Sequence, residues 1–290
     1  MLKRRVGNQI WLISQPDHAA VSGYLAAHWG NQEFAQPGYY APAPEPERLR
    51  AEVVLAIAEH DNGWWEWEAD PELSPKDGLP LHLTDLKQQH GLERWRLGVP
   101  RFAAEHPYVA LLISLHADWL QAQRVEAGLD AAFHHPLFGS PGSWPEPGPV
   151  ELEQARRFVA EQREMQAKLI ARMKSEAEWE AAVEPAHLHP HARLLQLADA
   201  LSLALCFGGD AALSLAQIPR RSWDDRVTLE LSPGGSGRVV CQPYPFDTDP
   251  LPVHLRARVL DMPFEKPKDF HSWWHRTARQ QIRFEYCSGV

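Results

Sequence analysis

A carboxylate in the most apolar segment of the chain restricts what this sequence can fold into. Residues 191–207 are expected to form a buried helix, and Asp199 falls on the same side of it as Leu195. Burying an unpaired carboxylate costs several kcal/mol even after the surroundings relax. The fold must therefore supply Asp199 with a proton, with a paired cation such as Arg193 or Arg172, or with a metal ion.

Three histidines are placed in the same way on other predicted helices. His18 begins the apolar side of one helix, His60 continues the apolar side of a second, and His116 lies within the apolar stripe of a third. These helices are expected at residues 18–29, about 46–61 and about 107–123. A single such histidine is usually a hydrogen-bonded core residue, but four ligand-type side chains on separate apolar faces indicate a shared buried site.

The doublet His60-Asp61 lies where the second helix is expected to end. Adjacent helical residues diverge by about 100°, so both side chains reach one site only near a helix end, which Asn62-Gly63 supplies. Imidazole nitrogen together with carboxylate oxygen suits Fe, Mn, Co, Ni or Zn better than Ca, which prefers oxygen ligands alone. The expected ligands of one or two divalent transition-metal ions are His18, His60, Asp61, His116 and Asp199.

The order of these residues resembles that of the HD superfamily of metal-dependent phosphohydrolases. In that superfamily a first His, an HD doublet and a final Asp bind the metal, and the resemblance assigns these positions to His18, His60-Asp61 and Asp199. The separations between these positions are longer than in the common pattern, which implies a divergent member. The phrases QPDHA, AEHDNGW, LLISLH and LLQLADALSL also resemble, over most of the chain, a bacterial family that carries only a domain-of-unknown-function label.

The resemblance to the HD superfamily implies hydrolysis of a phosphoester or nucleotide by a metal-activated water. A divalent ion lowers the pKa of bound water and polarises a phosphoryl oxygen. Asp61 would bind or orient that water. His116 would act either as a further metal ligand or as a general acid that stabilises negative charge beside the site.

Two other functions stay open at this level. One is a di-iron oxygenase of the HD type, similar to myo-inositol oxygenase, in which histidines between the doublet and the final Asp complete six protein ligands. The candidates here are His82, His106 and His116. The other is a non-catalytic binding or sensory protein on a degenerate HD scaffold, with the C-terminal sheet as its partner surface and an edge strand suited to a homodimer.

Two further segments lie outside this group of residues. Residues 133–149 are rich in Pro and Gly and are expected to form a loop or lid. His134 and His135 at its edge could approach a substrate, but solvated loop histidines are the simpler interpretation. The tryptophans within residues 64–67 could stack on a base or sugar, or pack in the core.

The periodicity predicts a mainly α protein, an HD-like helical bundle with a small antiparallel sheet. Residues 14–218 are expected to form the helical metal-binding domain. Residues 219–290 are expected to form a small antiparallel β region, because the segments VTLEL, RVVCQ, HLRARVL and QIRFEYC alternate between apolar and polar residues. Residues 1–13 are expected to form one or two strands that pair with this sheet.

Charge and cysteine content limit the partners and the compartment. A formal net charge of −9 argues against nucleic-acid polymers and anionic membrane surfaces, so the expected partner is a small molecule, phosphorylated or not. No apolar segment is long enough to span a membrane. The cysteines Cys206, Cys241 and Cys287 show no disulfide or zinc spacing, which fits a reducing compartment. We expect a cytoplasmic protein.

Overall fold

The computed structural model describes residues 1–126, 129–130, 133, 135, 147–261 and 270–289. Its α-helices are α1 (Gln15–Ala27), α2 (Pro46–Ala58), α3 (Trp65–Ala69), α4 (Gln88–Gly98), α5 (Pro107–Val125), α6 (Pro149–Lys174), α7 (Pro185–Cys206) and α8 (Phe270–Arg276). Its strands are β1 (Leu2–Val6), β2 (Gln9–Ile13), β3 (Leu213–Ser222), β4 (Asp225–Gly235), β5 (Arg238–Gln242), β6 (Leu251–Asp261) and β7 (Gln280–Ser288). Most of the expected loop or lid at 133–149, His134 included, lies outside the described residues.

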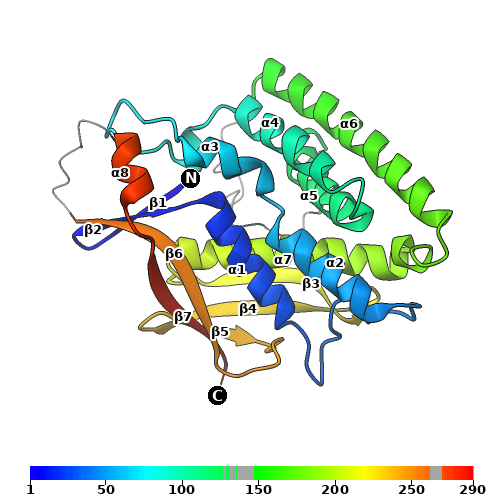
Figure 1. Ribbon diagram of the computed structural model, residues 1–290. Helices are drawn as coiled ribbons and strands as arrows, with labels where there is room; N and C mark the ends of the chain where they lie inside the picture. Colours follow the sequence, from blue (N-terminus) through cyan, green and yellow to red (C-terminus); the bar gives the residue numbers. More distant parts are fainter. Residues whose placement is uncertain (127–128, 131–132, 134, 136–146, 262–269, 290) are drawn as a thin grey trace.

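The described strands form one seven-stranded sheet in the order β1-β2-β6-β7-β5-β4-β3 (Figure 1). Strands β5 and β7 pair in parallel, and the other neighbours within the described part of the chain are antiparallel. The N-terminal hairpin joins the sheet through β2 and β6, with Trp11 opposite Val259. Strand β7 lies between β6 and β5 and therefore connects the two halves of the sheet.

The expectation of a mainly α bundle with a small antiparallel sheet is wrong, because the chain has an α/β fold with a large mixed sheet. The four alternating segments lie within β4, β5, β6 and β7, but the prediction lacks β3. That strand contains Pro219, and its pairing with β4 shifts register between Leu215 and Ile218, so the alternation is interrupted. The parallel pair joins segments remote in sequence, which alternation alone cannot reveal.

The long helices lie in layers over one face of the sheet (Figure 1), whereas α8 packs on Leu12 and Leu260 of the other face. Helix α7 packs along β3 and α1 packs on β6, while α2 and α5 pack on these two helices and α6 packs on α5. The phenol of Tyr286 in β7 donates a 2.8 Å hydrogen bond to the carbonyl oxygen of Leu201 in α7. Helix α7 is thus enclosed between the sheet and other helices, which explains why its sequence is apolar on nearly every side.

Two properties of the described chain bear on its environment. None of the helices in the described ranges has both the length and the apolarity needed to cross a membrane. All three cysteines are buried free thiols, and Cys206 in α7 packs as a core residue.

Candidate metal centre

The structure brings the five predicted ligands together at one buried place. They come from the first turn of α1, from the residues just after α2, from α5 and from α7. Their exposed fractions are 1% for His18, 2% for His60, 5% for Asp61, 2% for His116 and 3% for Asp199.

The start of α1 is fixed by hydrogen bonds that place His18. The hydroxyl of Ser14 caps the helix by accepting a hydrogen bond from the backbone N–H of Asp17, and it donates to the Asp17 carboxylate at 2.6 Å. Arg279, which immediately precedes β7, donates to the other oxygen of Asp17 at 2.8 Å. These contacts hold the first helical turn rigidly, and His18 is the next residue.

The turn after α2 directs His60 and Asp61 into the same site. A 3-10 turn, Asn62–Trp64, follows the doublet at once. A Cβ added to Gly63 would lie 1.9 Å from the carbonyl oxygen of Arg94 in α4. The close approach of the α4 backbone therefore requires glycine at this position.

Replacing Gly63 with Ala is expected to destabilise the protein by roughly 1–3 kcal/mol, because the new methyl group pushes α4 away from the turn. Thermal unfolding measures this change. Gly91→Ala in α4 is the matched control, since nothing lies within 4 Å of a Cβ added there. Helix propensity alone predicts that this control gains about 0.5–1 kcal/mol. Equal unfolding temperatures for the two variants would contradict the close contact.

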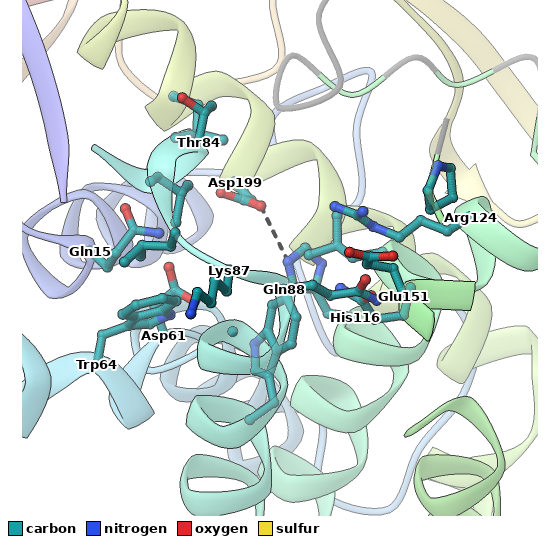
Figure 2. Close-up of a pocket in the computed structure, with 18 of the residues that line it drawn as sticks. Gln15, Asp61, Trp64, Thr84, Lys87, Gln88, His116, Arg124, Glu151 and Asp199 are labelled. Atoms are coloured by element: carbon teal, nitrogen blue, oxygen red, sulfur yellow. Dashed lines mark hydrogen bonds and ion pairs between the residues drawn. The ribbon is translucent and has the colours of Figure 1, made fainter. Parts of the chain in front are cut away.

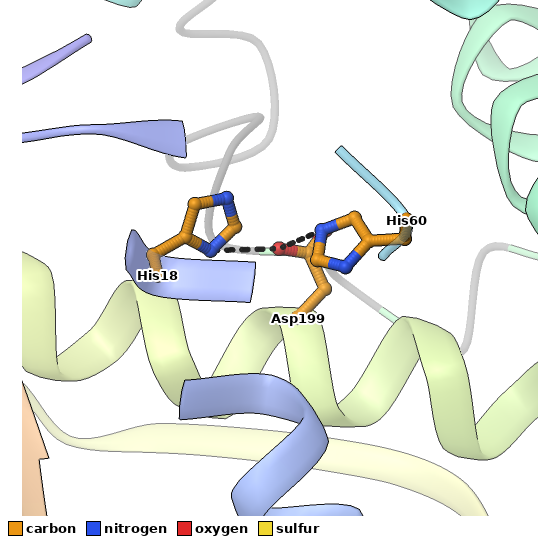
Figure 3. Close-up of side chains that lie close together, drawn as sticks. All are labelled: His18, His60 and Asp199. Carbon is orange, nitrogen blue, oxygen red and sulfur yellow. Dashed lines mark ion pairs between the residues drawn. The ribbon is translucent and has the colours of Figure 1, made fainter. Parts of the chain in front are cut away.

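Asp199 lies at the middle of the site, and each of its carboxylate oxygens faces two histidines. Oδ1 is 3.5 Å from His60 Nε2 and 3.7 Å from His18 Nδ1 (Figure 3). Oδ2 is 3.2 Å from His116 Nε2 and 3.1 Å from His135 Nε2. One carboxylate therefore joins two pairs of imidazoles.

Asp61 links the first histidine pair from the opposite side. Its Oδ2 lies 2.9 Å from His18 Nε2 and 3.7 Å from His60 Nε2. Within the described residues, His18, His60 and Asp199 each offer a ligand atom within 4.8 Å of the others, a spacing that could hold one metal ion. The carboxylate of Asp61 borders this group through its contact with His18.

Nε2 of His60 and Oδ1 of Asp199 lie 3.5 Å apart in the interior of the site. Its Nδ1 donates to the carbonyl oxygen of Ile57 at 2.8 Å, so in the neutral ring Nε2 carries a lone pair. That lone pair faces Oδ1 of Asp199, and neither buried atom has a hydrogen-bond partner. Two acceptors turned toward each other need a proton or a metal ion between them.

The charges in the site act against the effect of burial. Burial alone would lower the pKa of His60, but the carboxylates of Asp61 and Asp199 outweigh it and raise that pKa to about 9. Burial favours neutral carboxyl groups, yet the surrounding histidines hold the pKa of Asp61 below its usual value and that of Asp199 well below it. Burial lowers the pKa of His116, which favours its neutral, metal-binding form.

His135 is the site residue that the sequence analysis missed. It is fully buried against Asp199, whereas solvated loop histidines were the preferred interpretation for this segment. The two other histidines considered as ligands lie elsewhere: His106 pairs with Glu52 at 2.7 Å, and His82 contacts Thr84. The signal for a buried His135 in the sequence is the group of apolar residues around it, Phe133, Leu137 and Phe138, in a segment otherwise rich in Pro and Gly.

A pocket of about 640 Å³ opens directly onto this group (Figure 2). His18, Asp61, His116 and Asp199 line it. Its other walls include the side chains of Trp64, Lys87, Gln88, Gln121, Arg124 and Glu151. Burial lowers the pKa of Arg124, while Glu151 acts in the opposite direction. The volume fits a small molecule of nucleotide size.

The tryptophans after the doublet have separate environments. Trp64 is 3% exposed and lines the pocket. Trp65 is 50% exposed. Trp67 lies 4.8 Å from the ring of His90 and beneath the guanidinium of Arg94. Of the three, Trp64 alone contributes to the pocket wall.

Comparisons with known proteins bear on the family of the chain. Comparison with curated proteins gives no match, and comparison with solved structures gives none either. The model of a family described as "protein of unknown function (DUF3891)" matches residues 1–262, and the chain belongs to this family.

Proposed function

We propose that this protein is a metal-dependent hydrolase that acts on a phosphoester or nucleotide. The observation that carries the proposal is the position of Asp199, whose two oxygens each face two histidines at the floor of a pocket. The ligand order His18, His60-Asp61, Asp199 supports a divergent HD-type centre on this α/β scaffold. His135 extends the ligand set that the sequence predicts.

The donor atoms fit a transition-metal ion. Four imidazoles and two carboxylates form a mixed nitrogen and oxygen set, which suits Fe, Mn, Co, Ni or Zn. A cation between Nε2 of His60 and Oδ1 of Asp199 would satisfy both buried atoms. The two oxygens of Asp199 would allow this residue to serve two adjacent ions.

Asp61 and His116 have different roles in the proposed reaction. A bound divalent ion supplies an activated water and polarises a phosphoryl oxygen. Asp61 is ionised, accepts a hydrogen bond from His18 and lines the pocket, so it can orient a water through its carboxylate. We assign His116 a ligand role rather than that of a general acid, because burial favours its neutral form and its Nε2 faces Asp199.

The pocket walls favour an anionic substrate. Lys87 and Arg124 supply two positive charges along the pocket, of which that of Arg124 is opposed by Glu151. Cations that flank a metal centre neutralise the charge of a phosphoryl group during transfer. Their presence supports a phosphoester over a neutral substrate.

Metal analysis and a phosphatase assay test the proposal together. Protein purified without chelator is expected to contain one or two transition-metal ions per chain and to hydrolyse p-nitrophenyl phosphate or one of a panel of nucleotides. Treatment with EDTA is expected to abolish the activity, and a divalent ion such as Mn²⁺ or Co²⁺ should restore it. Metal-free protein that binds none of these ions would refute the proposal.

The di-iron oxygenase is the second candidate, and one observation favours it. The five predicted residues and His135 together offer six candidate protein ligands, the number that such a centre uses, while His82 and His106 lie elsewhere. Two irons per chain, with oxygen consumption and no phosphatase activity, would select this alternative.

A further inference from the structure

His135 lies 3.1 Å from Asp199, and Asp130, five positions earlier in the chain, accepts two side-chain hydrogen bonds. Unlike the other five candidate ligands, which lie on or just after helices, His135 belongs to no helix or strand in the described chain. Holding such a residue in one position costs conformational entropy, so the fold must fix its segment by other contacts. The described residues of this segment that lie nearest in sequence are Asp130 and Phe133.

Asp130 makes two contacts through a single carboxylate oxygen. Its Oδ2 accepts a hydrogen bond from Arg193 at 2.7 Å and another from the indole N–H of Trp119 at 2.9 Å. Arg193 belongs to α7 and Trp119 to α5, so the carboxylate joins both helices to the segment. The backbone of Asp130 has φ of 53°, a left-handed conformation that Asp tolerates better than most residues.

The same two partners also contact the residues beyond Asp130. The guanidinium of Arg193 lies 4.4 Å from the ring centre of Phe133. The indole of Trp119 lies 5.7 Å from the ring of Phe133 and 5.7 Å from the ring of His135. Arg193 is 7% exposed and Trp119 is 9% exposed, so these contacts are shielded from water.

Trp119 also connects this group to the ligand on its own helix. Its indole stacks on His116, one turn earlier in α5, with 6.3 Å between the ring centres. One side chain thus contacts both histidines that face Oδ2 of Asp199. Asp130 is therefore hydrogen-bonded to the side chain that contacts both of these histidines.

We propose that Asp130 is a positioning residue that holds His135 against Asp199 through Arg193 and Trp119. The part of this inference that concerns metal binding rests on the proposed function. His18, His60 and Asp61 are placed by α1 and the turn after α2, whereas the hydrogen bonds of Asp130 go to Trp119 in α5 and Arg193 in α7. Loss of the Asp130 charge therefore releases His135 and weakens the metal position between His116 and His135, while the position between His18 and His60 keeps its ligands.

Chemical modification of metal-free protein tests the placement of His135 directly. In Asp130→Asn, modification of His135 by diethyl pyrocarbonate, followed by mass spectrometry, is expected to be at least about tenfold faster than in the wild type, because local opening exposes a side chain that is otherwise buried. His18 and His60 should stay as protected as before. Asp118→Asn is the control, since it removes a carboxylate of α5 that pairs with Arg163 instead. Equal protection of His135 in wild type and Asp130→Asn would overturn the proposal.

Titration with Co²⁺, followed by its visible absorption, tests the consequence for the metal centre. Wild type is expected to bind two ions. In Asp130→Asn the affinity for one ion should fall by about 10–100-fold, the usual cost of losing a group that orients a ligand. The affinity for the other ion should not change. An equal loss of affinity for both ions in Asp130→Asn would contradict a positioning role.

The two measurements separate the inference from the proposed function. If His135 becomes reactive only in Asp130→Asn while wild type binds no Co²⁺, the positioning role holds and the metal-dependent hydrolase is wrong. If wild type binds two Co²⁺ ions and Asp130→Asn binds each of them with unchanged affinity, the positioning role is wrong and the proposed metal centre stands. Trp119→Phe keeps an aromatic ring, although a smaller one, and removes the N–H donor, so it should reproduce part of the Asp130→Asn effect in both measurements.

Discussion

Replacing Asp199 with Asn is expected to empty the metal centre. The carboxylate lies against His18, His60, His116 and His135, so its loss removes a ligand from every metal position the site offers. Losing a group that merely orients a ligand costs roughly 10–100-fold in metal affinity, and we expect at least the upper value for Asp199 itself. Because of this loss of affinity, the metal content of Asp199→Asn after dialysis should fall below about a tenth of the wild-type value.

Asn is the informative replacement because it keeps the shape of the side chain and removes its charge. Asp118→Asn provides the matched control, since Asp118 is a buried carboxylate on a neighbouring helix and does not line the pocket. We expect the control to retain its metal and any phosphatase activity. An Asp199→Asn protein that holds wild-type amounts of metal would contradict the central role of this carboxylate.

Replacing Phe284 with Ala is expected to produce a large loss of stability. Phe284 is 4% exposed in β7, which lies at the centre of the sheet although the family match ends at residue 262. Removing a buried phenyl ring from a core costs about 3–5 kcal/mol. Denaturant unfolding measures the change as a lower midpoint with an unchanged slope.

Gln281→Ala on the same strand controls for the change of side chain. Gln281 is exposed, so its replacement should alter the free energy of unfolding by less than about 0.5 kcal/mol. A Phe284→Ala protein as stable as this control would mean that the region beyond the family match is not an integral part of the sheet.

Residues of the candidate centre can be located from the sequence where regular helices carry them. His18, His116 and Asp199 lie on buried, mainly apolar helical faces, and a charged or ionisable group at such a position has few physical explanations. Helical periodicity is a local property of the sequence, so it can be recognised without knowledge of the tertiary fold. The structure places these residues together, while their role in binding metal stays a prediction.

His135 and the extent of the sheet could not be found in this way. His135 is buried against Asp199 of α7 and Trp119 of α5, contacts that no local sequence pattern encodes. The mixed sheet depends on β7 pairing in parallel with β5, which no local pattern encodes. Both features arise from non-local contacts, and these decide the fold class as well as the position of His135 in the candidate site.

The position of β7 also determines when during synthesis this fold can be completed. Translation proceeds at roughly 5–20 residues per second, and domains fold as they emerge. Until residues 280–288 leave the ribosome, β6 and β5 lack the strand that separates them, and each presents an open edge to other nascent chains. A ribosome that stalls before residue 280 would therefore release a polypeptide with two unclosed half-sheets, a substrate for chaperones rather than a smaller working protein.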